Sequence, residues 1–109
     1  MSARLVALST APSAEVAEQL ARALVGEGLA ACVNVVPGVT SYYRWKGELQ
    51  RDAEWLLVIK TRAARLEALK AALARLHPYE VPELVALKVE DGLPPYLAWL
   101  DESTGGDRA

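Results

Sequence analysis

The chain has 109 residues, 52% of them apolar, and a formal net charge of −2 at neutral pH. This length fits one domain with a small hydrophobic core, and the lack of a basic block argues against nucleic-acid binding. A single cysteine, Cys32, excludes an intramolecular disulfide and is typical of a reducing compartment. We expect a soluble cytoplasmic protein, because the N-terminal apolar stretch is too short for a signal peptide and no segment could span a membrane.

The first part of the chain predicts a strand followed by a helix. The apolar run at residues 3–10 is typical of a buried strand. Ser13 is a suitable helix N-cap. Three apolar residues then repeat at four-residue spacing, which places them on one face of a helix: Val16, Leu20 and Leu24.

Residues 29–61 predict a long β-hairpin with a bulge at Pro37-Gly38 and a turn at Lys46-Gly47. Each arm of roughly 14 residues would extend about 45 Å at about 3.3 Å per residue. A compact domain of this length has a diameter of only about 34 Å. The hairpin therefore either projects and packs on identical subunits, which we favour, or curls over its own sheet.

The second half of the chain predicts a helix, a strand and a last helix. Residues 62–76 form an alanine-rich helix that ends at His77-Pro78, since the residue before a proline avoids helical geometry. Its apolar stripe is predicted to be Leu66, Leu69, Leu73 and Leu76. An alternating strand follows at residues 83–90, then a short helix at 94–103, and a flexible tail at 104–109.

This order of elements, β-α-β-β-α-β-α, predicts an α+β ferredoxin-like sandwich built on a split βαβ arrangement. The single domain covers residues 1–103. Two helices would cover one face of the sheet, and the other face would stay bare.

Three segments are similar to the CutA family of divalent-cation tolerance proteins: "ACVNVVPGVTSYYRWKGE", "IKT" and "HPYEVPE". They occur in the family's order and spacing, and the resemblance extends from "STAP" to "YLAWL". It implies a ferredoxin-like subunit and a tight homotrimer whose sheets meet edge to edge, as in the PII signalling proteins. It also implies an association with copper binding and with tolerance of divalent metals.

The same resemblance implies a copper site that is depleted in this chain. The family's described ligands are a cysteine on the first strand and two adjacent histidines before the "PY" pair. The corresponding positions here are Ser9, Leu76 and His77, so only the last can bind metal.

His77, Glu80 and Glu83 form the candidate metal set, because imidazole suits Cu and Zn and carboxylates can complete a site. Their three-residue spacing places them on one face of an extended segment. One extended turn rises about 9.3 Å, however, so the segment cannot wrap a single ion without a sharp turn or ligands from another subunit. The structural alternative for His77 is a cap at the helix C-terminus, where an imidazolium is favoured.

Two further residues of the strands have a structural and a functional interpretation. Cys32 is predicted to be a small core residue. Lys60 is predicted either to pair with Glu54 or Glu83 or to line an anion-binding pocket. The other members of that pocket would be Tyr79 and a neighbouring subunit's Trp45 or Arg44.

Large amphipathic side chains gather along the hairpin and resemble an interface set more than a ligand-stacking set: Tyr42, Tyr43, Trp45 and Trp55. They therefore predict contacts between identical subunits, in addition to any unknown protein partner.

The resulting functional hypothesis is a homotrimer that binds Cu or another divalent metal weakly, with no essential cofactor and no membrane partner. The alternative is a PII-like trimeric sensor or scaffold that binds a small anion between subunits. An enzyme is the least favoured hypothesis, because the sequence contains no glycine-rich phosphate loop, no paired-histidine zinc motif and no nucleophile triad.

Overall fold

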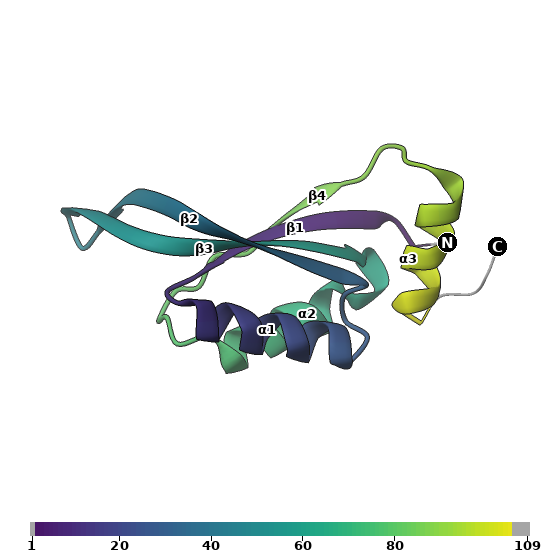
Figure 1. Ribbon diagram of the computed structural model, residues 1–109, viewed down its shortest axis with the longest axis horizontal. Coiled ribbons are helices and arrows are strands. Elements are labelled where there is room, and N and C mark those ends of the chain that lie inside the picture. Colours follow the sequence, from purple (N-terminus) through teal and green to yellow (C-terminus); the bar gives the residue numbers. More distant parts are fainter. Residues whose placement is uncertain (1, 106–109) are drawn as a thin grey trace.

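The computed structural model describes residues 2–105 as a four-stranded antiparallel sheet in the order β2-β3-β1-β4. Helices α1 and α2 cover one face of the sheet, and α3 lies at one end beside the N-terminus (Figure 1). This is the predicted ferredoxin-like α+β arrangement. The elements in chain order are β1 (Arg4–Ala11), α1 (Ala14–Gly26), β2 (Cys32–Trp45), β3 (Glu48–Arg62), α2 (Ala63–Leu76), β4 (Val85–Lys88) and α3 (Pro94–Ser103).

The core lies between the sheet and its two covering helices. Helix α1 begins at Ser13, whose Oγ accepts a hydrogen bond from the Val16 N–H at 3.1 Å, as the sequence predicts. The apolar faces of α1 and α2 pack on alternate residues of β3. The apolar residues spaced at one helical turn and the inward-facing residues of the strand therefore form one core. Leu76 departs from its predicted stripe and is 41% exposed, because it is the last residue of α2.

Strand β3 alternates between the two faces of the sheet. Leu57, Ile59 and Thr61 are fully buried beneath the helices, whereas Val58 and Lys60 are only half-buried on the opposite face. No helix covers this second face of the sheet within the described part of the single chain, and we call it the open face.

The β2–β3 hairpin projects beyond the rest of the sheet (Figure 1). Strand β1 ends where Ala11 pairs with Trp55, so residues 39–45 and 48–54 pair only with each other. The register shifts between Val36 and Val39, at the predicted bulge, and the turn lies at Lys46-Gly47. The molecule measures 49 × 25 × 22 Å, which agrees with a projecting hairpin and not with a curled one.

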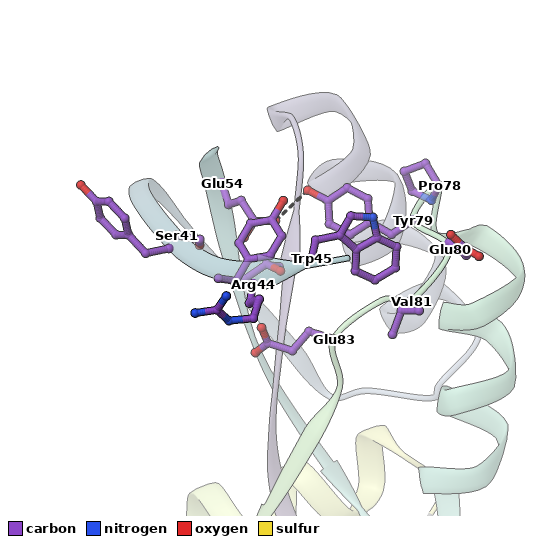
Figure 2. A pocket seen from close by; sticks show the side chains of 12 residues that line it. Ser41, Arg44, Trp45, Glu54, Pro78, Tyr79, Glu80, Val81 and Glu83 are labelled. Carbon is purple, nitrogen blue, oxygen red and sulfur yellow. Dashed lines mark hydrogen bonds between the residues drawn. The ribbon is translucent and has the colours of Figure 1, made fainter. Parts of the chain in front are cut away.

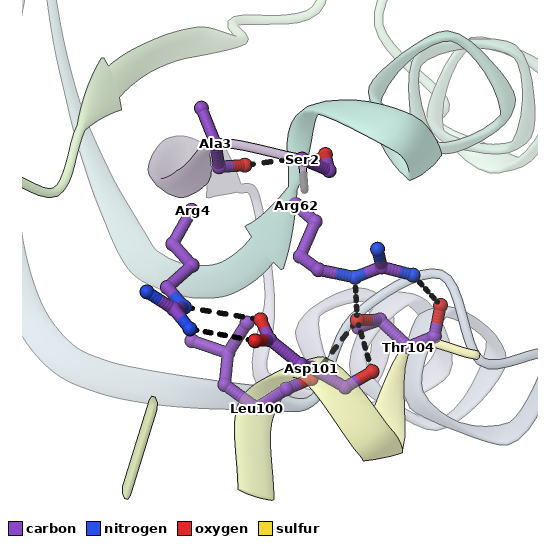
Figure 3. A network of polar contacts seen from close by, with 7 residues as sticks. All are labelled: Ser2, Ala3, Arg4, Arg62, Leu100, Asp101 and Thr104. Carbon is purple, nitrogen blue, oxygen red and sulfur yellow. Dashed lines mark hydrogen bonds and ion pairs between the residues drawn. The ribbon is translucent and has the colours of Figure 1, made fainter. Parts of the chain in front are cut away.

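Helix α3 is held to the end of the sheet by two arginines (Figure 3). Arg4 donates two hydrogen bonds to Asp101, at 3.0 and 2.6 Å, and holds the pKa of that carboxyl below its usual value. Arg62 donates to the Thr104 hydroxyl at 2.7 Å and to its carbonyl at 2.6 Å. The prediction of a flexible tail is wrong for Thr104, which is fully buried; residues 106–109 of that tail lie outside the described residues.

Two further expectations need correction. Strand β4 has four residues and not the eight predicted, because it is an edge strand that pairs only with Leu5–Leu8 of β1. Cys32 is not a core residue. It is half-buried on the open face, where its thiol lies 3.9 Å from Asn34 Oδ1. No helix in the described part of the chain is long and apolar enough to cross a membrane.

Candidate functional site

A groove with a volume of ≈ 830 Å³ separates the projecting hairpin from the loop that follows α2. Figure 2 shows its two walls, with Trp45 and Glu54 on the hairpin strands and Tyr79 and Glu83 on the loop. The bulge in β2 and the prolines of the loop place these distant segments opposite each other.

His77 anchors the loop from behind the groove. It is 6% exposed, and its Nε2–H donates to the Thr10 carbonyl at 2.7 Å while its Nδ1 accepts the Tyr79 backbone N–H at 3.1 Å. Nε2 carries its proton towards Thr10 and the Nδ1 lone pair accepts from Tyr79, so neither ring nitrogen is free to bind a metal ion in this arrangement. His77 is the C-terminal cap residue of α2, but its ring bonds to β1 and to the loop and does not act as an imidazolium at the helix end.

Tyr79 and Glu54 join the two walls of the groove. The Tyr79 hydroxyl donates to Glu54 Oε2 at 2.7 Å (Figure 2). Burial and this hydrogen bond raise the pKa of the Tyr79 phenol well above its usual value, so the phenol remains a donor. Burial, followed by the nearby charge of Glu54, also raises the pKa of the Glu83 carboxyl.

The structure does not bring His77, Glu80 and Glu83 together as one metal site. Glu80 and Glu83 line the groove, whereas His77 lies behind it with its nitrogens occupied. Within residues 2–105, no group of three or more His, Cys, Asp or Glu side chains has the arrangement needed to hold a metal ion.

The predicted ligand pocket is only partly assembled. Arg44, Trp45 and Tyr79 of one chain line the same groove, whereas the sequence predicts that Trp45 or Arg44 comes from a neighbouring subunit. Lys60 is not part of it, since its ammonium donates to Asn34 Oδ1 on the open face and pairs with neither Glu54 nor Glu83.

A protein family model described as CutA1 divalent ion tolerance protein matches residues 5–103. The chain belongs to this family. The divalent-cation tolerance protein CutA of Thermus thermophilus is 55% identical over 100 residues, which cover 92% of this chain and 97% of that protein. Human CutA is 47% identical over 98 residues, which cover 90% of this chain. The match covers only 55% of the human protein, so the chain spans about half of that relative's length.

Solved CutA structures have the same fold. The Thermus thermophilus protein superimposes with a TM-score of 0.92 at 54% identity, covering 94% of this chain and 99% of that one. CutA1 from Oryza sativa gives a TM-score of 0.92 at 46% identity, with 94% of each chain covered.

The positions at which this CutA chain departs from the family's copper pattern lie in different environments. Ser9 is fully buried under the helices, and its hydroxyl has no hydrogen-bond partner among the described residues. Leu76 is 41% exposed and next to His77.

The aromatic set of this CutA chain divides into two groups. Tyr42, Tyr43 and Trp45 are exposed on the projecting hairpin, where they could contact another molecule. Trp55 instead packs against the core of its own chain, so its inclusion in the interface set is not supported.

Sequence reasoning missed the central residue of the groove. Glu54 was considered only as a partner for Lys60, whereas it is 6% exposed and faces the loop. Its neighbours Asp52 and Gln50 lie in the same strand among polar residues, so nothing in the local pattern distinguishes it. The single available signal was a carboxylate placed directly before an apolar run, residues 55–59.

Proposed function

We propose that this CutA chain is a cytoplasmic homotrimer that binds Cu(II) or a related divalent ion weakly at its groove and thereby contributes to divalent-cation tolerance. One observation carries the proposal. Glu54, Glu80 and Glu83 all line the groove, and within residues 2–105 no ion pair joins any of them to a basic side chain. Burial, followed by the nearby charge of Glu54, raises the pKa of Glu83, and a bound cation would favour the ionised carboxylate against both effects.

The kinds of donor atom in the groove determine how tightly it would bind a metal ion. With His77 occupied by Thr10 and Tyr79, the groove offers carboxylate oxygens from Glu80 and Glu83 but no free imidazole or thiolate. Water or a neighbouring subunit would complete the coordination shell. Such a site is weak for every divalent ion, and it should bind Cu(II) more tightly than Zn(II) in accordance with the general order of divalent affinities.

The proposed trimer is supported by surfaces that the single chain leaves open. Tyr42 is 65% exposed at the hairpin, and Leu87 is 58% exposed on the edge strand β4. Strands β2 and β4 are the two edges of the sheet, and each has one side without a strand partner in the described chain. Light scattering should give three times the mass of one chain at micromolar concentration, and a monomer would contradict this part of the proposal.

The cytoplasmic location is proposed from the single cysteine, which suits a reducing compartment. Relatives differ in this respect, since one is named chloroplastic in Arabidopsis thaliana and another periplasmic in Archaeoglobus fulgidus.

The charge of the groove does not favour the anion-binding alternative. Three carboxylates and one guanidinium line it, and the lysine expected in an anion pocket, Lys60, bonds to Asn34 on the open face. We therefore propose no second function.

Calorimetric titration with Cu(II) and then Zn(II) tests the metal proposal. The unmodified protein should bind Cu(II) more tightly than Zn(II), and the double variant Glu80→Gln/Glu83→Gln should weaken both by about tenfold or more, which is about 1.4 kcal/mol of binding free energy. Glu67→Gln is the matched control, because Glu67 is an exposed carboxylate on α2 that pairs with Lys70. Undetectable binding, or binding lost in His77→Ala and unchanged in the double variant, would overturn the proposed ligand set.

A further inference from the structure

The two hydrogen-bond partners of His77 fix its protonation state. The Thr10 carbonyl can only accept a hydrogen bond, so Nε2, which lies 2.7 Å away, carries a proton. The Tyr79 backbone N–H can only donate, so Nδ1, which lies 3.1 Å away, presents its lone pair. The ring is 6% exposed and neutral, and Nδ1 is the atom at which it can take up a second proton.

The loop that follows His77 has few other attachments. Among the described residues, two hydrogen bonds fasten residues 78–84, and both belong to Tyr79. Its N–H donates to His77 Nδ1, and its hydroxyl donates to Glu54 at 2.7 Å (Figure 2). Leu84 packs against the core at the far end of the loop. The position of the loop between its two ends therefore depends on the lone pair of Nδ1.

Protonation of Nδ1 is incompatible with this arrangement. A protonated Nδ1 and the Tyr79 N–H are both donors, so they cannot share a hydrogen bond and the Tyr79 backbone must move away. His77 is also the C-terminal cap residue of α2, where the carbonyl end of the helix favours an imidazolium. Two states are therefore available to His77: a neutral ring with the loop bound, and a charged ring with the loop released.

No ion pair compensates an imidazolium while the loop is bound. Thr10 on β1 offers a neutral carbonyl, and the Tyr79 ring, 4.7 Å from the imidazole between centroids, separates it from Glu54 on β3. The titratable and charged side chains of the adjoining segments are Arg75 in the last turn of α2, Glu15 in the first turn of α1, Glu54 on β3, and Tyr79, Glu80 and Glu83 on the loop.

We propose that His77 is a pH-sensitive switch: the neutral ring holds the loop of residues 78–84 against β1, and protonation of Nδ1 releases it. Release moves Tyr79, whose hydroxyl joins the loop to the hairpin through Glu54. Histidine ordinarily changes its charge between about pH 5 and 8, so moderate acidification is the signal. The switch goes beyond the proposed metal binding, because it is a property of the chain without metal.

The test is an NMR titration of the ¹⁵N-labelled full chain, without added metal, from about pH 8 to about pH 5. The chain contains one histidine, so its ring signals are unambiguous. At the upper end, Nε2 should carry the proton and Nδ1 should not. As the pH falls, protonation of Nδ1 and the change in the Tyr79 amide signal should share one midpoint.

Amide hydrogen exchange on the same samples measures release of the loop. After correction for the intrinsic pH dependence of exchange, protection of the Tyr79 amide should fall by roughly three- to tenfold, the effect of about one hydrogen bond. The Leu57 amide lies in the buried part of β3 and should keep its protection throughout, which shows that the chain stays folded.

Two variants separate His77 from the other titratable groups of the loop. His77→Gln keeps a side-chain amide that can donate to the Thr10 carbonyl but does not titrate, so the Tyr79 amide should show no transition over this range. Glu83→Gln removes a carboxyl of the same loop whose pKa is raised by burial and by the charge of Glu54, and the transition should remain.

The proposal is overturned if the His77 ring takes up a proton while the Tyr79 amide stays protected, if the ring stays neutral over the whole range, or if the transition persists in His77→Gln. A transition lost in Glu83→Gln would assign the pH response to that carboxyl instead. Simultaneous loss of protection at Tyr79 and Leu57 would mean global unfolding and would exclude a local switch. Because the samples contain no metal, absence of Cu(II) binding would overturn the proposed metal site without affecting this result.

Discussion

Strands β2 and β3 run through two regions of different character. Beneath the helices, Leu57 and Ile59 are fully buried, and Thr61 donates a hydrogen bond to the Leu29 carbonyl at 2.6 Å. Beyond the end of β1, the same two strands expose Leu49 and bury Glu54, whose Oε2 accepts a hydrogen bond from the Tyr79 hydroxyl. The pairing of β2 with β3 therefore continues well beyond the part of the sheet that β1 extends and the helices cover.

Under the proposed trimer, the hairpin beyond β1 is the part of the chain that contacts between copies would stabilise. A region that buries apolar side chains and satisfies its polar groups gains most of its free energy within one chain. A region with exposed aromatic rings gains free energy when a second copy covers the rings, as in the proposed trimer. Mutations in the two regions should consequently differ in size and in their response to ligands and assembly.

The largest expected difference is between Leu57→Ala and Leu49→Ala. Leu57 is fully buried, and its truncation should lower the free energy of unfolding by about 2–5 kcal/mol. Leu49 is 74% exposed, and its truncation should change that free energy by less than about 0.5 kcal/mol. Urea unfolding at one protein concentration measures both. Equal losses would contradict the comparison and show that the hairpin is buried in an assembly.

His77→Ala tests the junction between the two regions. Its loss leaves the Thr10 carbonyl and the Tyr79 N–H without their partner, which should cost about 2–3 kcal/mol of unfolding free energy. The neighbouring variant Leu76→Ala should cost less than about 1 kcal/mol, because Leu76 is 41% exposed. If the His77 variant were as stable as the Leu76 variant, His77 would not anchor the loop, and a role in ligand binding would become the better explanation.

Two buried hydroxyls of the helix-covered region should respond with opposite signs. Ser9 Oγ has no partner among the described residues, so Ser9→Ala should raise the free energy of unfolding by about 1 kcal/mol. Thr61→Val should lower it by about 1–2 kcal/mol, because the Leu29 carbonyl loses its donor. Denaturant midpoints measured side by side give both signs, and destabilisation by Ser9→Ala would reveal a partner for that hydroxyl.

The smallest expected effect is the pH dependence of Glu83. Its folded-state pKa is raised above the ordinary value of 4.5, so the fold disfavours the ionised carboxylate. The stability associated with protonated Glu83 is fully present below that ordinary value and is lost as pH rises through the higher folded value. Glu83→Gln should therefore slightly raise the melting temperature at neutral pH.

The melting-temperature difference between Glu83→Gln and the unmodified chain should shrink as pH falls towards 4.5. Glu67→Gln, which removes an exposed carboxylate paired with Lys70, should show no such rise at neutral pH. A difference of constant size across this pH range would mean that burial and the charge of Glu54 do not disfavour ionised Glu83.

Local pattern was sufficient for most of the fold. The four-residue repeat of Leu20 and Leu24 predicts α1, and the apolar far end of the second hairpin arm predicts the buried part of β3. The bulge followed from Pro37, which lacks an N–H for pairing, and from Gly38, whose φ of +79° suits glycine. Strand β4 was predicted too long because its length depends on how many residues of β1 remain beside it.

The site was less predictable, because its contacts join residues far apart in the sequence. Tyr79, Trp45 and Arg44 line one groove within a single chain, whereas the sequence predicts a pocket between subunits. The predicted pocket also includes Lys60, but the Lys60 ammonium donates to Asn34 Oδ1. Glu54 was not recognised as a site residue, because its burial results from the hairpin and the loop closing over it.

The sequence by itself determined the order of elements, the ferredoxin-like arrangement, the projecting hairpin and the membership of the CutA family. Only the tertiary structure decided that both nitrogens of His77 are hydrogen-bonded and that Glu54 is buried against the Tyr79 hydroxyl. Patterns of hydrophobicity and turn residues act over a few positions. The contacts of His77 with Thr10 and of Tyr79 with Glu54 span 67 and 25 positions, and they form only when the sheet and its crossing loop are assembled.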